Sequence, residues 1–344
     1  RPQLKAMLTM GGVMIALMWA TFVVLYFAAW PWLPLAPEVT GVGRLAMAAL
    51  LATVTVSFSP TVSIAVITES RARGPLTELV LALVVLGDLM LILLFTLSME
   101  SVRFVLGSGQ HGQGILSGLA WEVFGSFAFG GIVGACFAFY LRYVSREVTV
   151  VLLGVAVVLS QVGAALHFEP LLAALAAGLV VENIAPPEGD ALRLAVERGA
   201  LPILVLFFAA AGANLHIDAV RQVGIFAVVI SAIRLVLIRS TARVSARVAG
   251  LSGETTSMAW MGLVSQAGVT LGLAILINTE FPGWGARVYA LIVAMITLHE
   301  TIGPILFRSA LMKAGEIGRM DIQEHAASPA ADSDTHVPDA SAPA

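Results

Sequence analysis

Long apolar segments alternate with short polar ones along the whole chain, and this pattern predicts membrane-spanning helices. Most of the segments are about 20 residues long, the length that a helix needs to cross roughly 30 Å of hydrocarbon. None shows the period-two alternation of a transmembrane barrel strand. Ten apolar segments can be marked, at residues 7–34, 44–69, 77–99, 117–141, 148–165, 170–184, 191–213, 219–247, 256–278 and 286–307. We therefore expect an all-α, polytopic transmembrane helix bundle with about ten spans.

The composition agrees with a protein that has lipid as its solvent. Hydrophobic residues make up 58% of the 344 residues, only 12% are charged, and the mean hydropathy is +0.92. Soluble domains carry about 25% charged residues. The single cysteine, Cys136, excludes an internal disulfide framework. No nucleophile–base set or metal-ligand cluster stands out, so we expect no enzyme, no cofactor, no resident metal and no nucleic-acid partner.

The distribution of basic residues predicts the orientation in the membrane. With ten spans and the N-terminus inside, 13 of the 19 Lys and Arg residues fall on the inner face and 4 on the outer face. This is the asymmetry that cytoplasmic loops show. We expect a transmembrane domain over residues 1–313 of a multi-pass protein of the cell inner (plasma) membrane. Residues 314–344, rich in Ala, Asp, Ser and Pro, are expected to be a disordered cytoplasmic tail. Because the chain opens on Arg1, we also expect it to lack its N-terminal helices.

One acidic residue stands near the middle of an apolar segment. Asp88 lies in the sequence LVVLGDLMLILLF. A carboxylate at the centre of a bilayer costs at least about 2.5–3.5 kcal/mol on insertion scales, so such residues are usually functional. The alternative is a neutral acid that is hydrogen-bonded within a helix interface.

Two spans carry the signature of an interrupted helix. In the second span, Ser57, Ser59 and Thr61 surround Pro60, which cannot donate a backbone hydrogen bond. The ninth span contains GLVSQAGVT, with Ser265 and Gln266 at its centre. Freed carbonyls and hydroxyls at such breaks can coordinate a cation, although a plain proline kink is the alternative for the first. Each interrupted span is followed by one with an acid, Asp88 and then Glu300, and this layout indicates an internal repeat.

Two arginines lie inside the long eighth span. Arg234 and Arg239 could each extend along an aliphatic stem to the membrane surface. An arginine that stays inside needs an acidic partner, and Asp88 is the obvious one. Glu300 is a second candidate polar site, with a helix–helix hydrogen bond as the alternative.

The residues also resemble a known family. SFSPTVSIAVITESRARGPLTELVLALVVLGDLMLILLF is similar to a segment of bacterial Kef-type monovalent cation:proton antiporters, in which Ser-Pro, a helix, Glu-x-x-x-x-Gly-Pro and an acid follow one another. GLVSQAGVTLGLAILINTEFPGWG and HETIGPILFRSALMKAGE resemble the closing helices of the same superfamily. The resemblance covers essentially the whole chain before the tail.

The resemblance implies a sodium/proton-antiporter-like inverted-repeat fold with two discontinuous crossing helices, and the chain would hold the last ten of its thirteen helices. It implies a homodimer and places the ion-binding aspartate at Asp88. It puts Ser59 and Pro60 where other branches carry a Thr-Asp pair. Counting back from Gln266 makes Arg239, rather than Arg234, the family's basic residue. Gly87 departs from the polar residue that often precedes the aspartate, which argues against two-carboxylate, electrogenic exchange.

The function that these observations predict is secondary active transport. Na⁺ or K⁺ would compete with protons at Asp88, aided by Ser59 and Thr61, and Arg239 would stabilise the ionised acid. Two alternatives remain open at this point. One is a sodium-coupled organic-anion symporter, and the other is a non-transporting membrane sensor or scaffold of the same fold.

Overall fold

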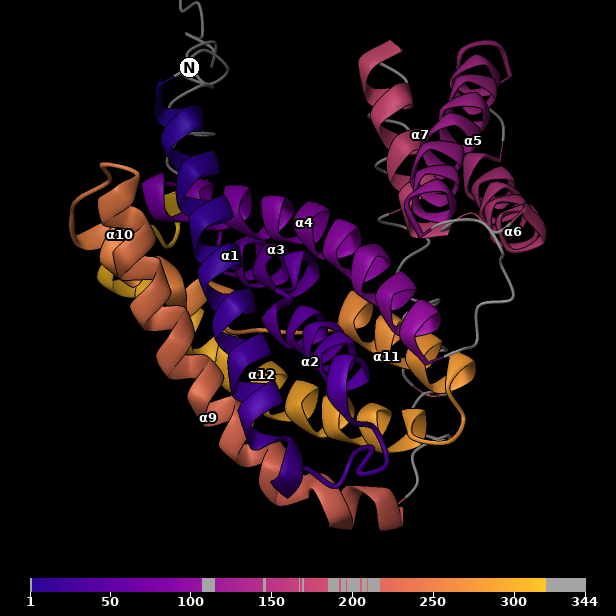
Figure 1. Cartoon of the computed structure of the whole chain (residues 1–344). Helices are drawn as coiled ribbons and strands as arrows, with labels where there is room; N and C mark the ends of the chain where they lie inside the picture. The colour runs from indigo at the N-terminus through magenta and orange to yellow at the C-terminus, as the bar shows by residue number, and fades with distance from the viewer. Residues whose placement is uncertain are drawn as a thin grey trace, which may run out of the picture.

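A computed structural model describes residues 2–106, 115–144, 147–166, 168, 170–184 and 217–319, together with the single positions 192, 196, 205 and 209. Every regular element in these ranges is a helix (Figure 1). The long helices are α1 (Pro2–Ala29), α4 (Pro75–Val105), α5 (Ile115–Tyr143), α9 (Ile217–Val248) and α12 (Gly285–Lys313). The all-α prediction is confirmed.

Fewer membrane spans can be counted in the described residues than the sequence predicted for the whole chain. Six helical segments of the described residues are long and apolar enough to cross a membrane, or seven if one bent pair counts as a span. The helices α6 (Val148–Leu166) and α7 (Pro170–Ile184) are shorter. Helices occupy nine of the ten predicted segments, and the segment at 191–213 lies almost wholly outside the described residues. A count of about ten spans is therefore not confirmed.

The first interrupted helix breaks where the proline predicts it. The helix α2 (Gly41–Val56) ends before Ser57, and α3 (Pro60–Glu69) begins at the proline. Pro60 is suited to the first helical position, where its missing N–H costs nothing. The Ser59 hydroxyl accepts a hydrogen bond from the Val62 N–H at 3.3 Å and caps α3. The three residues between the helices leave their backbone groups open to other partners.

The second interrupted helix lies near the other end of the chain. It consists of α10 (Glu254–Met258), the 3₁₀ turn η2 (Ala259–Leu263) and α11 (Gly268–Glu280). Residues 264–267 separate η2 from α11, and the two parts are bent by 41°. Together with the α2–α3 break, this confirms the prediction of two discontinuous helices.

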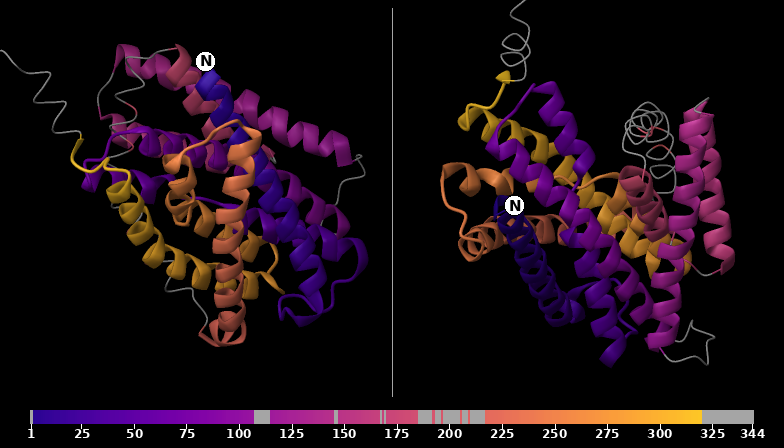
Figure 2. Two further views of the ribbon diagram at one scale, coloured as in Figure 1. Left: turned by 90° about the vertical axis from the view of Figure 1, so that its left-hand side faces the viewer. Right: turned by 90° about the horizontal axis from the view of Figure 1, so that it is seen from above.

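The helices form a main bundle and a separate group. The main bundle has one continuous core built from α1, α2, α4, α9, α11 and α12. The helices α5, α6 and α7 form their own group, with a small core that includes Phe137, Leu141 and Val181 (Figures 1 and 2). Within it, α5 and α7 touch backbone to backbone, because a Cβ atom at Gly134 would lie 2.5 Å from the Ala177 carbonyl oxygen.

Ordered structure continues beyond the predicted domain boundary at residue 313. Glu316 is only 1% exposed, and its carboxylate accepts hydrogen bonds from the N–H groups of Leu76 and Thr77 at 2.7 and 2.9 Å. The Thr77 hydroxyl donates a third, at 2.7 Å. The two N–H groups belong to the first turn of α4, where backbone N–H groups have no acceptor within the helix. The folded part therefore extends past residue 314, where we expected the tail to begin, because this carboxylate caps α4. Residues 320–344 lie outside the described residues.

Candidate functional site: the crossing of two broken helices

The two helix breaks meet each other in the main bundle. The hydroxyl groups of Ser57 and Thr270 are 2.7 Å apart, and the Ser63 hydroxyl donates to the Gly262 carbonyl at 3.2 Å. Ser57 and Ser63 flank the first break, whereas Gly262 and Thr270 flank the second. The side chains of Ser57, Ser63 and Thr270 are almost fully buried. The two breaks thus form a single polar crossing within an apolar bundle.

The guanidinium group of Arg234 joins the two breaks. It has no exposed surface and donates to the carbonyls of Thr55 at 2.8 Å, Ser57 at 2.6 Å and Val264 at 2.7 Å. Thr55 and Ser57 belong to the end of α2, and Val264 follows η2. Carbonyls at a helix C-terminus lack intrahelical partners and carry the negative end of the helix dipole. A fixed cation with several donors satisfies both requirements.

The structure reverses the choice between the two arginines. Arg239 is exposed, and its guanidinium lies 5.5 Å from the centre of the Trp260 ring rather than at the crossing. Five residues along an α-helix correspond to a rotation of about 140°, so Arg234 and Arg239 project from different sides of α9. Arg234, which the sequence reading ranked second, is the arginine at the breaks.

Gln266 and His299 complete the crossing. The Gln266 amide nitrogen lies 3.2 Å from the Val54 carbonyl, 3.1 Å from the Thr55 carbonyl and 2.9 Å from the Ser57 hydroxyl. Its amide oxygen is 2.8 Å from Nδ1 of His299, on α12. Sequence reasoning named Gln266 but passed over His299 in favour of Glu300. The sequence feature that could have identified His299 is its position within an apolar span, shortly before the Ile-Gly-Pro sequence.

Asp88 lies on α4 beside the first break. Its neighbour Gly87 packs against Phe58, since a Cβ atom at Gly87 would come within 2.7 Å of the aromatic ring. Asp88 is half-buried, and its Oδ1 atom is buried without a hydrogen-bond partner. In the described part of the chain no ion pair joins Asp88 to Arg234. The expected acid–arginine pair is thus not formed here, and Arg234 donates to three backbone carbonyls instead.

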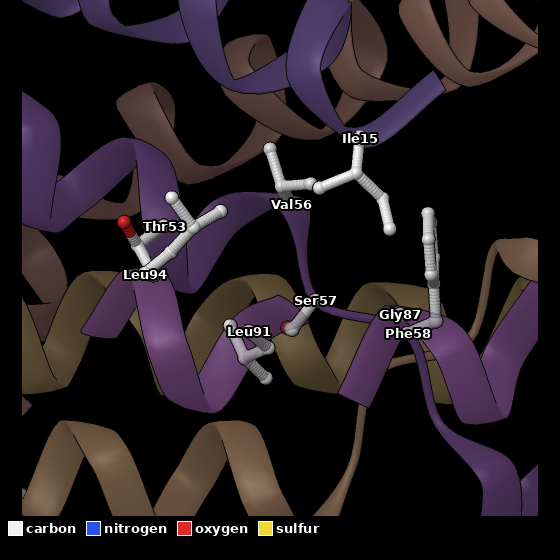
Figure 3. Close-up of a pocket in the computed structure, with 8 residues that line it drawn as sticks. All are labelled: Ile15, Thr53, Val56, Ser57, Phe58, Gly87, Leu91 and Leu94. Carbon is white, nitrogen blue, oxygen red and sulfur yellow. The ribbon is translucent and has the colours of Figure 1, made fainter. Parts of the chain in front are cut away.

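A small pocket opens between α1, the first break and α4 (Figure 3). Its wall is mostly apolar, with the Thr53 and Ser57 side chains as polar exceptions. It is lined by Ile15, Thr53, Val56, Ser57, Phe58, Gly87, Leu91 and Leu94. The stretch of α4 that carries Asp88 therefore lines the same pocket as the first break.

The other predicted site residues occupy different places. Ser59 is buried and caps α3, but Thr61 is exposed. Ser265 is buried against α12, where a side chain at Gly303 would collide with its hydroxyl group. Glu300 is half-buried on α12. The structure therefore brings Ser57, Gln266 and Arg234 together and leaves Thr61 outside that set.

The chemistry of the crossing is that of oxygen ligands and one unpaired acid. Within the described residues, no group of three or more His, Cys, Asp and Glu side chains could hold a metal ion. The carbonyl and hydroxyl oxygens of the crossing are engaged by Arg234, Gln266 and Thr270. Oδ1 of Asp88, on the neighbouring helix α4, is buried and has no such partner. An acid in this situation can bind a proton or a hard monovalent cation.

Comparison with known proteins gives a consistent result. A sequence model of the family described as "Sodium/hydrogen exchanger, transmembrane" matches residues 1–313. A solved structure of the sodium proton antiporter MjNhaP1 from Methanocaldococcus jannaschii is similar, with a TM-score of 0.62. The match covers 91% of this chain and 84% of that chain at 14% sequence identity, so it concerns the fold alone. No curated protein matches the chain.

Proposed function

The chain belongs to the sodium/hydrogen exchanger family, and we propose that it exchanges Na⁺ or K⁺ for protons at the carboxylate of Asp88. Cation:proton antiport is the activity of the family, and the chain is an integral multi-pass membrane protein. The finer assignments, namely the aspartate, the choice of cation and the route of exchange, are our proposal.

The observation that carries the proposal is the unpartnered oxygen of Asp88. Its Oδ1 atom is buried, makes no hydrogen bond and lies on the stretch of α4 that packs against the first break. Burying a carboxylate oxygen without a partner is costly unless it is protonated or binds a cation. At a site that binds a proton and a cation alternately, one of these two ligands is the partner of Oδ1 at each stage.

The crossing supports this function by keeping two helices broken in the membrane. Broken helices near the midplane, held against each other, are the usual binding architecture of alternating-access transporters. Arg234 brings a positive charge into the bundle and donates hydrogen bonds to carbonyls of both breaks. We propose that Asp88 binds the cation with help from the buried hydroxyl group of Ser59, and that movement of the bundle exposes the loaded site to the other side.

The direct test is Asp88→Asn, which retains the shape of the side chain but can neither release a proton nor bind a cation by charge. Everted vesicles with the full-length protein should lose cation-dependent proton release by at least about 100-fold, as expected when an essential group is removed. The matched control is Glu78→Gln, the same change at an exposed position in the first turn of α4. Exchange that persists in Asp88→Asn would refute the proposal.

The assay also distinguishes cation:proton exchange from both rival functions. It contains Na⁺ or K⁺ and no organic solute, so a sodium-coupled symporter would show no flux. A sensor or scaffold would show none with any cation. We further propose the cell inner membrane, with cytoplasmic ends and a homodimeric assembly, as the setting of the exchanger.

A further inference from the structure

The side chain of His299 is buried completely within the crossing. It comes from α12, has no exposed surface and places Nδ1 2.8 Å from the amide oxygen of Gln266. Gln266, which is 1% exposed, belongs to the second break. His299 therefore touches the crossing from a helix that is in neither break.

The neighbours of Gln266 determine which way its amide points. The carbonyls of Val54 and Thr55 can only accept hydrogen bonds, so the nitrogen of the amide must face them. The amide oxygen then faces His299 and needs a donor. Nδ1 of His299 must therefore carry a proton, which fixes the tautomer of the ring.

The opposite nitrogen of the ring is consistent with this tautomer. Nε2 of His299 is buried and makes no hydrogen bond to a side chain, and the ring lies against the backbone of Ser231. A proton on both nitrogens would make the ring a second cation beside the crossing that already holds Arg234, which an apolar interior disfavours. A neutral ring with Nδ1–H satisfies Gln266 without adding charge.

His299 is linked to the first break through Gln266, which donates to the Thr55 carbonyl together with Arg234. The Thr55 oxygen accepts from Gln266 at 3.1 Å and from Arg234 at 2.8 Å. If Gln266 loses its anchor, its amide can rotate, and the Val54 and Thr55 carbonyls lose a donor. The end of α2 would then relax next to Phe58 and Gly87, where α4 carries Asp88.

We propose that His299 is a positioning residue for the cation site: its Nδ1–H fixes the Gln266 amide, which in turn holds the end of α2 in the shape that the site beside Asp88 requires. This inference rests on the proposed exchange at Asp88. It assigns His299 no contact with the ion.

The test uses four variants of the full-length protein in everted vesicles. His299→Asn offers an amide N–H close to the position of Nδ1, and His299→Gln places its amide near the position of Nε2 instead. His299→Leu removes both nitrogens. Thr301→Val, on the same helix at an exposed position, is the control. The apparent KM for Na⁺ and for K⁺ and the maximal rate are measured for each.

The leucine and glutamine variants should raise the apparent KM of the transported cation about tenfold, as expected for the loss of one buried hydrogen bond. His299→Asn should stay within about threefold of the unchanged protein, and Thr301→Val should not differ from it. If His299→Leu does not fold, the comparison of the asparagine and glutamine variants decides, because both are polar and differ in where the amide lies.

Equal KM values for the asparagine and glutamine variants would overturn the positioning role. So would an unchanged KM in a folded His299→Leu protein. Both outcomes are distinct from a failure of the proposed function, in which the unchanged protein shows no cation-dependent proton release or Asp88→Asn retains it.

Discussion

A buried guanidinium group must have its charge and its donors satisfied by the protein itself. Arg234 meets this need with three backbone carbonyls, which two broken helices leave without intrahelical partners. The requirement is mutual, because burying these carbonyl oxygens without the hydrogen bonds from the arginine would also cost free energy. The arginine and the breaks therefore depend on each other.

This dependence predicts different effects for the two arginines of α9. Arg234→Met should destabilise the protein by at least about 1.5–3 kcal/mol, the range for a single hydrogen bond to a charged group, since it removes three such bonds to backbone carbonyls. Arg239→Met should have little effect, because that side chain is exposed and lies over the Trp260 ring. Thermal unfolding in detergent measures both. Equal losses of stability in the two variants would contradict the prediction.

Some single residues were predictable from the sequence and others were not. Asp88 and Gln266 stand out because polar side chains are costly in an apolar span. The choice between Arg234 and Arg239 failed because counting along the chain does not determine which side of α9 faces the breaks. His299 was missed because only the packing of α12 shows that its ring meets Gln266.

At the scale of elements, local chemistry predicted the helix breaks well. Pro60 and the serines beside it act on their own backbone, so the first break needs no information from the rest of the fold. The extension of the folded part to Glu316 was not predictable. The carboxylate is stabilised by the first turn of α4, some 240 residues away along the chain.

The contact between Glu316 and α4 can be tested by one substitution. Glu316→Ala leaves the amides of Leu76 and Thr77 without an acceptor and should cost about 1–2 kcal/mol, as the loss of a helix cap does. Hydrogen exchange at these two amides should accelerate by about tenfold or more. Lys313→Ala, at the exposed end of α12, is the control. Unchanged exchange at Leu76 and Thr77 would show that the cap is not needed.

The glycines of α5 carry a second prediction at this scale. A side chain at Gly130 would collide with the backbone of Ala173 on α7, whereas one at Gly131 would make an ordinary contact with Val180 at 3.9 Å. Gly130→Ala should therefore separate α5 from α7 and destabilise the group by about 1–3 kcal/mol, as overpacking does. Gly131→Ala should be close to neutral. Thermal unfolding compares them, and equal stability of the two variants would argue against the close backbone contact.

At the scale of the whole molecule, the sequence predicted the class and the family but not the arrangement. Apolar length establishes that helices cross a membrane, yet it does not say which helices pack together. The separation of α5–α7 from the main bundle depends on side-chain shape, which hydropathy does not contain. The meeting of the two breaks was inferred from their layout and from the resemblance, and the hydrogen bonds between Ser57, Thr270 and Gln266 give it its geometry.

The proposed competition at one carboxylate would make the whole exchanger dependent on pH. As the pH falls, protons occupy Asp88 and the apparent KM for the cation should rise; as the pH increases, too few protons remain for the return step. The rate should therefore pass through a maximum between these limits. Cation-dependent proton release in vesicles, measured over a series of pH values at several cation concentrations, tests this. A KM that does not change with pH would rule out a shared site.

The fixed charge of Arg234 has an electrical consequence. With Asp88 ionised and empty, the positive and negative charges of the two side chains cancel, and with either a proton or a monovalent cation bound the pair carries one net positive charge. Each 100 mV of membrane potential contributes about 2.3 kcal/mol per charge that crosses. In a one-for-one exchange the same charge crosses in both directions, so these contributions cancel. The cell's voltage then performs no net work on the cycle, and the direction of exchange follows from the two concentration gradients alone.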